Sequence, residues 1–297
     1  MSQLAFGTAP LGGLFGPVEE DDAVALVHEA LDLGITFVDS SPYYGNAEER
    51  LGKALLGHRD QVVLATKAGR YGPTAFDFSP TRLRRSVEQS LRLLRTDHLD
   101  ILQLHDIEFA PLGPVLDDSY AALVAMRDEG LCRYVGMTGY PIATMARALR
   151  ETELDVLLTY AHATLLDDSL QHDLAPVAAA RGTGLVNAAA VSLGLLTPAG
   201  SSMGVEHPAT APIRSAARAM VDHCTARGVD IAFVANQYAV QRSGCATTVI
   251  GTARSAHLRS AVAAADAPLD EVLVAELLAL RPPTEHRCWS SGLPENN

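Results

Sequence analysis

The chain has 297 residues, a length at which a barrel of alternating strands and helices commonly forms one domain. Its 35 acidic residues outnumber its 23 lysines and arginines, giving a net charge of -12, and no Lys/Arg-rich run is present, so nucleic acid and anionic membranes are poor candidate partners. Four scattered cysteines without metal-ligand or redox spacing, no signal-peptide pattern and no apolar stretch of membrane-spanning length predict a cytoplasmic protein.

Short apolar runs typical of buried β-strands occur eight times along the chain, and segments of helical period lie between them. The predicted strands cover residues 4–7, 36–38, 62–66, 101–104, 134–137, 156–158, 184–186 and 247–250. The predicted helices cover residues 21–33, 47–55, 80–94, 119–129, 142–150, 174–181, 213–227 and 255–265. Ser79 precedes Pro80 as an expected N-cap. Expected left-handed C-caps are Gly34, Gly57, Gly130, Gly182 and Gly228.

Eight strand and helix repeats predict an α/β fold of the (β/α)8 TIM-barrel type, because buried parallel strands need helices over their outer face. We expect a single domain over residues 1–297, in which residues 282–297 form a C-terminal tail. A doubly wound sheet is the alternative. The glycine-rich stretch at 12–16 does not lead into a helix with the dinucleotide fingerprint, so this alternative is weak.

Polar residues follow several predicted strands, at the end where a parallel barrel places its active site. Asp39, Lys67 and His105 follow the second, third and fourth strands, and Tyr44 lies five residues after Asp39. Lys67 is one of only two lysines in the chain, the other being Lys53. Each of the four alone has a structural explanation: a helix-capping Asp, a packed Tyr, a Lys whose amine reaches solvent, or a satisfied buried His.

Together the four residues suit proton transfer during hydride transfer at a carbonyl or carbinol carbon. An ammonium beside a phenol brings the phenol pKa down from its ordinary value of about 10. Asp39 would pair with Lys67 and keep it charged, and His105 would orient the substrate oxygen. We therefore expect the pKa of Tyr44 to be lowered by Lys67.

Three motifs resemble those of the aldo-keto reductases. They are FVDSSPYYGNAE at 37–48, ATK at 65–67 and LQLH at 102–105, and the match runs in order from residues 6–8 to residues 250–252. The sequence segments at 105–109, 136–141 and 288–292 are similar to those of the sugar 1-dehydrogenase branch of that family.

The resemblance implies that Tyr44 is the general acid/base and that Asp39, Lys67 and His105 support it. Tyr43 is the rival phenol, but the spacing from Asp39 and the following Gly45 favour Tyr44. The implied reaction is NAD(P)+-dependent oxidation of a cyclic hemiacetal, such as L-galactose, L-fucose or D-arabinose, to its lactone. Alternatives are an NADPH-dependent aldehyde or ketone reductase, a pyridoxal 4-dehydrogenase, and a non-enzymatic, cofactor-binding regulatory subunit.

The resemblance also places the cofactor. Where many members have Ser-Asn against the nicotinamide carboxamide, this chain has Thr138 and Gly139, and the stacking Tyr of many relatives aligns near Ala188. Asn187 either donates a hydrogen bond there or satisfies nearby backbone. The remaining expected cofactor contacts are Gly251, Thr252, Arg254 and His257.

Arg254 is the only residue among these expected contacts that is always positively charged. NADPH-preferring relatives carry both a Lys and an Arg here for the ribose 2'-phosphate. We therefore expect NAD to be preferred and NADP tolerated, without a metal.

The expected substrate contacts are Tyr140, His162 and Trp289. Trp289, the only tryptophan, either stacks on a sugar face or packs on the barrel wall. The expected partner is a small sugar or lactol, and we expect a monomer or small homo-oligomer.

Overall fold

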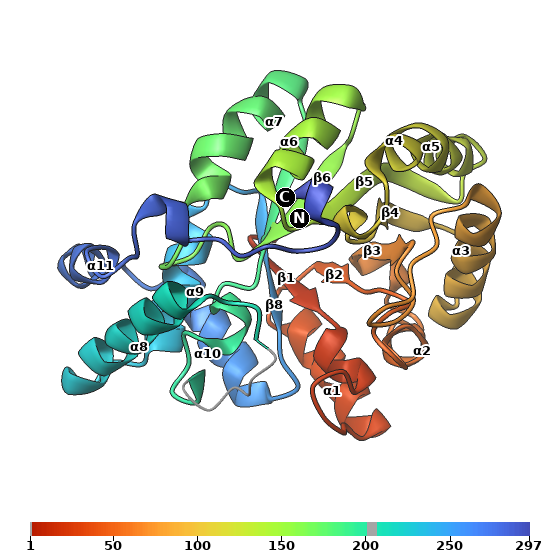
Figure 1. The fold of residues 1–297 in the computed structure, drawn as a ribbon. Coiled ribbons are helices and arrows are strands. Elements are labelled where there is room, and N and C mark those ends of the chain that lie inside the picture. Colours follow the sequence, from red (N-terminus) through yellow and green to blue (C-terminus); the bar gives the residue numbers. More distant parts are fainter. Residues whose placement is uncertain (1, 201–206) are drawn as a thin grey trace.

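The computed structural model describes residues 2–200 and 207–297, and its eight parallel strands close into one barrel in chain order (Figure 1). The strands are β1 (Leu4–Gly7), β2 (Phe37–Asp39), β3 (Val63–Ala68), β4 (Leu99–Leu104), β5 (Cys132–Gly139), β6 (Val156–Tyr160), β7 (Gly184–Ala188) and β8 (Thr247–Gly251). Every strand lies within two residues of its predicted bounds. The predicted (β/α)8 barrel is confirmed.

Helices surround the barrel and cover the outer face of the strands (Figure 1). They are α1 (Glu20–Asp32), α2 (Ala47–Ala54), α3 (Pro80–Leu94), α4 (Leu112–Pro114), α5 (Tyr120–Asp128), α6 (Ile142–Glu151), α7 (Ala175–Arg181), α8 (Ala211–Ala226), α9 (Ile231–Arg242), α10 (Ser255–Asp266) and α11 (Glu271–Leu278). None of the helices in the described ranges is long and apolar enough to cross a membrane.

The helix-end signals are confirmed at the C-termini, and Ser79 and Pro80 occupy the expected N-cap and first-turn positions of α3, although the expected side-chain capping bond is absent. All five predicted C-cap glycines have a left-handed backbone, with φ between 66° and 86°. Ser79 makes no side-chain cap to α3; its own backbone N–H donates to Asp77 Oδ1 at 2.9 Å. The local turn before α3 is therefore made by an aspartate two residues earlier.

Between β7 and β8 the described residues, which omit 201–206, form two α-helices, α8 and α9, where the sequence predicted one at 213–227. The second helix, α9, packs against β8 and α10, so it covers the barrel, while α8 packs on α9. Several faces of α9 are apolar, and its Ile231, Val234 and Tyr238 are buried. A helix covered on two sides lacks the amphipathic period that reveals a surface helix, which explains the omission.

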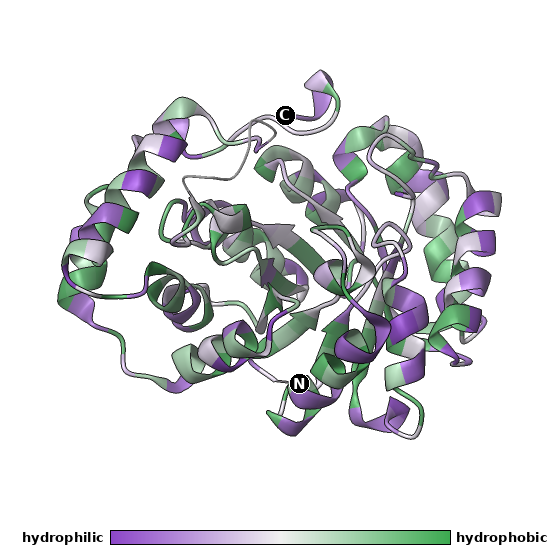
Figure 2. Cartoon of the chain, turned by 90° about the horizontal axis from the view of Figure 1, so that it is seen from below, coloured by the Kyte–Doolittle hydropathy of each residue, from purple (hydrophilic) through white to green (hydrophobic). Residues whose placement is uncertain are grey.

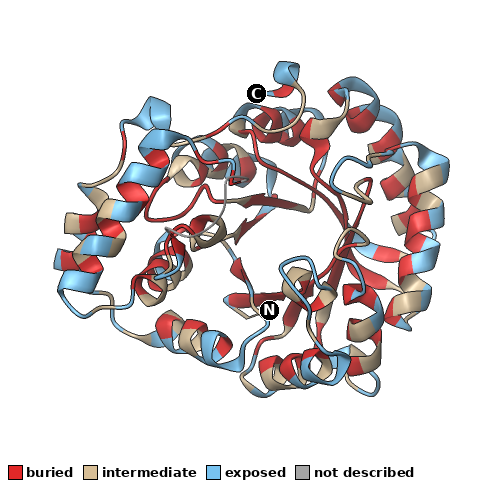
Figure 3. Ribbon diagram, turned by 60° about the horizontal axis from the view of Figure 1, so that its bottom comes forward, coloured by how far each residue is buried: buried red, intermediate tan, exposed pale blue. Residues whose placement is uncertain are grey.

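Seven strands contribute side chains that fill the barrel interior: Ala5, Phe37, Ala65, Ile101, Leu158, Val186 and Val249. Figure 3 shows buried strands inside exposed helix faces, and Figure 2 shows the matching apolar interior. Because side chains alternate along a strand, the residue two positions later points to the same side. This alternation brings Asp39, Lys67 and Gln103 to the carboxyl end of the barrel, above the apolar layer.

The chain after α11 crosses the carboxyl end of the barrel toward α6 (Figure 1). Asn296 Nδ2 donates to the backbone oxygen of Glu108 at 2.8 Å, and the backbone oxygen of Asn296 accepts from Thr144 Oγ1 at 2.6 Å. A Cβ at Gly292 would lie 2.2 Å from the Glu108 oxygen, so only glycine permits this approach. The tail therefore forms part of the wall around the barrel mouth.

Candidate active site

A buried ion pair lies at the barrel mouth between β2 and β3. Lys67 Nζ donates to Asp39 Oδ2 at 2.5 Å and to the backbone oxygen of Ser40 at 2.8 Å. Lys67 is 2% exposed and Asp39 3%, so the lysine amine does not reach solvent. Burial raises the pKa of the Asp39 carboxyl, and the adjacent ammonium opposes that rise. The pairing expected from the sequence is present.

Tyr44 lies against this ion pair, on the loop after β2. Lys67 Nζ is 5.0 Å from the centroid of the Tyr44 ring, and the Tyr44 ring meets the His105 ring edge-on at 5.7 Å between centroids. The rival phenol, Tyr43, instead has the Arg70 guanidinium over its ring at 4.0 Å. The geometry thus separates the two tyrosines, and Tyr44 is the one beside the lysine.

The pKa of Tyr44 is raised well above that of a free phenol, mainly by burial and then by the negative charges of Asp39 and Asp106. The expectation that Lys67 lowers it is wrong for this structure. The reason is that Asp39 neutralises the lysine, so little net positive field reaches the phenol. Tyr44 is therefore protonated at neutral pH.

The position of Tyr44 is fixed by close backbone contact with the glycine-rich loop after β1. A Cβ at Gly12 would lie 1.5 Å from the backbone oxygen of Tyr44, and a Cβ at Gly45, where φ is 57°, would lie 2.3 Å from the oxygen of Gly12. These glycines permit two loops to touch. The glycine-rich stretch at 12–16 thus serves loop packing at the mouth.

His105 is held by Ser41, a residue that the sequence analysis did not single out. Ser41 Oγ lies 2.9 Å from His105 Nδ1 and accepts from the backbone N–H of Tyr43 at 3.1 Å. Ser41 is fully buried, and its hydroxyl proton has no other acceptor among the described residues. The hydroxyl therefore donates to Nδ1, and the ring proton resides on Nε2.

The protonation state of His105 follows from its burial. Burial lowers the pKa of His105 to about 3, with the positive charges of Lys67 and Arg70 adding to the effect. The imidazole is neutral at physiological pH and presents an Nε2–H donor. A neutral donor can orient a substrate oxygen without giving up its proton.

The expected carboxamide contacts are only partly accessible. Thr138 Oγ1 accepts from the Asp106 backbone N–H at 3.0 Å and donates to Asp106 Oδ1 at 3.4 Å, so its hydroxyl is already engaged. A Cβ at Gly139 would lie 2.7 Å from Glu108 Oε2, so the buried glutamate takes the space of a longer side chain. Asn187 Nδ2 donates to the Ala163 backbone oxygen at 3.2 Å, while its Oδ1 has no partner among the described residues.

The expected adenosine contacts lie together after β8, at the N-terminus of α10. Gly251, Arg254 and His257 are exposed, and Thr252 Oγ1 accepts from the Arg254 backbone N–H at 3.0 Å. The first turn of α10 carries no acidic residue. The amides of this turn suit a phosphate group.

The three expected substrate contacts are buried and hold the tail. The Trp289 ring stacks on the Tyr140 ring at 4.3 Å and 14°, and the His162 ring lies 4.3 Å from Tyr140. His162 is fully buried, with Nδ1 at 2.7 Å from Asp167 Oδ2 and Nε2 at 2.7 Å from the Tyr140 backbone oxygen. Their burial favours the packing role that the sequence left open for Trp289, and does not support substrate contact.

Tyr160 is a further phenol at the mouth that the sequence analysis missed. It ends β6, two positions after the inward-facing Leu158, so the alternation of the strand was the available signal. Burial raises its pKa, and the charges of Asp106 and Glu108 raise it further. Tyr160 therefore belongs to the same cluster of polar groups as Asp106.

One group of possible metal ligands occurs in the described ranges. His162, Asp167 and Cys288 bring one ligand atom each to within 4.8 Å of one another. His162 Nδ1 is hydrogen-bonded to Asp167 here. The expected absence of a metal stays a prediction.

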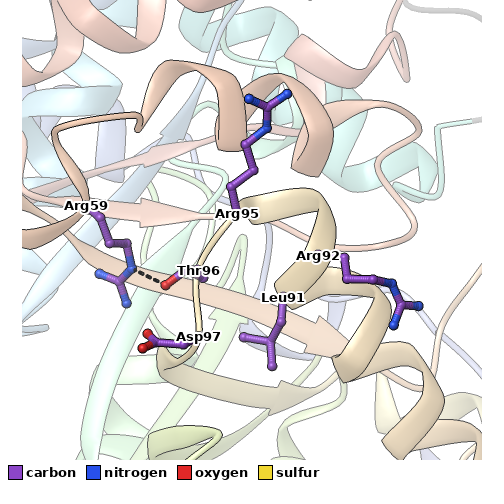
Figure 4. Close-up of a pocket in the computed structure, with 6 residues that line it drawn as sticks. All are labelled: Arg59, Leu91, Arg92, Arg95, Thr96 and Asp97. Carbon is purple, nitrogen blue, oxygen red and sulfur yellow. Dashed lines mark hydrogen bonds between the residues drawn. The ribbon is translucent and has the colours of Figure 1, made fainter.

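A surface hollow lies away from these residues. Its volume is about 570 Å³, and it is lined by Arg59, Leu91, Arg92, Arg95, Thr96 and Asp97 (Figure 4). These residues precede β3 and β4 or end α3, so they lie at the opposite end of the strands from Lys67. Active sites of such barrels lie at the carboxyl end.

The comparisons with known proteins agree with this arrangement. A family model described as the Aldo/keto reductase family matches residues 3–281. The chain belongs to the aldo/keto reductase family. It is an oxidoreductase by that membership, and the resemblance inferred from the motifs is confirmed.

Individual aldo/keto reductases and their relatives are similar over much of the chain. L-galactose dehydrogenase of Arabidopsis thaliana is 38% identical, over 100% of this chain and 95% of its own length. D-threo-aldose 1-dehydrogenase of a Pseudomonas species is 32% identical, over 62% of this chain and 64% of its own length. The holo structure of an aldo-keto reductase from Bacillus halodurans superposes with a TM-score of 0.78 at 22% identity, over 99% and 95% of the two chains, which supports the fold.

Ser41→Ala is expected to lower kcat/KM about tenfold, because one buried hydrogen bond of roughly 1–1.5 kcal/mol no longer fixes the His105 ring. Nitrogen NMR of His105 should then show loss of the Nε2–H tautomer as the single form. Ser40→Ala is the matched control, since the Ser40 hydroxyl is also buried but accepts from Thr8 Oγ1 at 2.9 Å. An unchanged tautomer in Ser41→Ala would contradict the assignment.

Proposed function

We propose that this aldo/keto reductase oxidises the cyclic hemiacetal of an aldose to its lactone, using a nicotinamide cofactor. The observation that carries the proposal is Tyr44 at the barrel mouth, between a buried Asp39–Lys67 pair and a neutral His105. Full-length similarity to an L-galactose dehydrogenase supports the substrate class. L-galactose, L-fucose and D-arabinose are the first candidates.

The proton moves between the substrate and Tyr44. The Tyr44 phenolate, as general base, takes the proton of the anomeric hydroxyl while the His105 Nε2–H donates to the same oxygen and orients it. Lys67 lies beside the ring, but its pairing with Asp39 leaves the pKa of Tyr44 raised, so the phenolate forms at alkaline pH. A nicotinamide held by Asn187 and the α10 turn would supply the acceptor for the hydride of the anomeric carbon.

Two features of the chain fit a nicotinamide cofactor. The buried, unpartnered Asn187 Oδ1 is an acceptor suited to a carboxamide N–H. The N-terminus of α10, with Arg254 beside it, suits a phosphate. Asn187 would thus hold one end of the cofactor and the α10 turn the other.

We further propose that the protein acts in the cytoplasm on small sugars or lactols. Its four cysteines are free thiols, which suits a reducing compartment.

A substrate screen tests the proposal directly. We expect L-galactose, L-fucose or D-arabinose with NAD+ to give a higher kcat/KM than pyridoxal with NAD+ or aromatic aldehydes with NADPH. The readout is nicotinamide absorbance, with lactone identified by mass spectrometry. Turnover of aldehydes alone would replace the proposal with a general aldehyde reductase, and cofactor binding without any turnover would favour a regulatory subunit.

Tyr44→Phe is expected to lower kcat about 100- to 10,000-fold, because the proton acceptor is lost, while cofactor binding persists. In the unchanged protein, oxidation should speed up as pH rises through the alkaline range. The sign follows from the raised pKa of Tyr44: the base form grows with pH, and oxidation requires it. Tyr43→Phe is the control. Full activity in Tyr44→Phe would rule out Tyr44 as the base.

We also propose that NAD is preferred and NADP tolerated, because Arg254 is the one cation expected at the adenosine end. Arg254→Ala should lower the ratio of kcat/KM for NADP+ over NAD+ about tenfold, the loss expected for one charge-assisted hydrogen bond. Arg259→Ala on the same helix is the control, since Arg259 pairs with Glu29 at 2.5 Å. A wild-type preference for NADP+ would contradict the proposal.

A further inference from the structure

A second buried ion pair lies beside His105 at the barrel mouth. The Asp106 carboxylate is ion-paired with the Arg70 guanidinium through Oδ2 and Nη1, and the same Oδ2 lies 3.7 Å from His105 Nε2. Asp106 is 4% exposed. Its backbone is left-handed, with φ of 54°, and its N–H donates to Thr138 Oγ1. A strained, buried aspartate beside the reacting groups points to function.

The loop after β3 holds Arg70 in place. Residues 69–77 form a small hairpin, in which the Tyr71 N–H donates to the Ala75 oxygen and the Asp77 N–H donates to the Gly69 oxygen, both at 2.8 Å. The guanidinium lies 4.0 Å from the Tyr43 ring centroid, and the rings of Phe76 and Phe109, at 5.3 and 5.5 Å, complete its surroundings.

Donors of this fixed guanidinium remain free. Nη1 bonds to Asp106 and Nε to the Gly72 oxygen at 3.4 Å, whereas Nη2 has no hydrogen-bond partner within residues 2–200 and 207–297. The Arg70 side chain is 18% exposed, so a small molecule can reach it. The pair therefore offers a carboxylate acceptor and a guanidinium donor side by side.

Both charges act on the reacting centre. The Asp106 charge raises the pKa of Tyr44 and the Arg70 charge lowers it, so both side chains lie within electrostatic reach of the phenol. The charges of the pair cancel. A neutral polyol therefore suits this wall better than a carboxylate or phosphate.

We propose that Asp106 and Arg70 form a subsite for the sugar hydroxyl next to the anomeric carbon. This rests on the proposed function, in which His105 Nε2 binds the anomeric oxygen. The hydroxyl on the carbon next to the anomeric carbon would then lie beside Asp106. A hydroxyl both donates and accepts, so it donates to the carboxylate and accepts from the guanidinium.

Deoxy sugars test the subsite. The measurement is kcat/KM for three sugars: L-galactose, its 2-deoxy analogue, and L-fucose, which is its 6-deoxy analogue. The wild type should favour L-galactose over the 2-deoxy sugar about 10- to 100-fold, the range for a hydrogen bond to a charged group. In Asp106→Asn and in Arg70→Gln this ratio should fall at least about tenfold, whatever the absolute rates.

The ratio for L-galactose over L-fucose serves as the internal reference and should stay the same in every variant. Arg82→Gln is the matched control, because Arg82 covers the Tyr71 ring at 3.7 Å without contacting Asp106. Arg70→Lys keeps the charge but loses the planar fork, so it should also lower the 2-deoxy ratio, and it carries the test if the other variants fail to fold.

The possible failures are distinguishable. A wild type that oxidises no aldose overturns the proposed function. If the wild type oxidises L-galactose but has the same kcat/KM ratio of L-galactose over 2-deoxy sugar as its Arg70 and Asp106 variants, the subsite alone is overturned. A merely structural role of the two residues would lower kcat/KM equally for all the sugars.

Discussion

The buried Asp39–Lys67 ion pair is the constraint on which the barrel mouth depends. Taking both charges out of water costs several kcal/mol each, so each charge needs partners in the interior. Lys67 finds them in Asp39 and in the Ser40 backbone oxygen, and Gln103 Nε2 approaches the second Asp39 oxygen at 3.4 Å. Removing either partner would leave an uncompensated buried charge, at a cost of about 3–5 kcal/mol. The pair therefore fixes the ends of β2 and β3 against each other.

The same pairing explains why the site has little net charge inside an acidic protein. The Asp39–Lys67 pair and the Asp106–Arg70 pair each cancel, and the His105 imidazole is neutral because burial lowers its pKa to about 3. A phenolate formed at Tyr44 would be the principal uncompensated charge of this group. The barrel mouth thus favours an uncharged, hydroxyl-rich substrate, in agreement with a sugar.

Much of the fold and the central residues could be predicted from the sequence, because they follow from the repeat of a parallel barrel. Asp39, Lys67 and His105 each follow an apolar run, and every barrel strand delivers such a residue to the same end. Long-range packing could not be predicted this way. Trp289 stacks on a ring 149 positions earlier in the chain, and no local pattern in the tail indicates that partner.

The wrong expectation about the Tyr44 pKa has a similar physical origin. The sequence shows that an ammonium can approach the phenol, but burial and the pairing of that ammonium decide the sign of the shift. The spacing of residues along the chain reveals neither the burial of the phenol nor the pairing of the ammonium. Ser41 was missed for the same reason, because its effect on His105 depends on where one hydroxyl proton points.

The loop that follows β2 connects these separate groups. Its Ser40 backbone oxygen binds the lysine of β3, its Ser41 hydroxyl orients the histidine after β4, and its Tyr43 ring supports the arginine of the β3 loop. Tyr44 follows directly and is held by backbone contact with Gly12. A displacement of this one loop would therefore alter the ion pair, the histidine tautomer and the phenol together. Five consecutive residues can coordinate the site because the buried charge of Lys67 anchors the first of them.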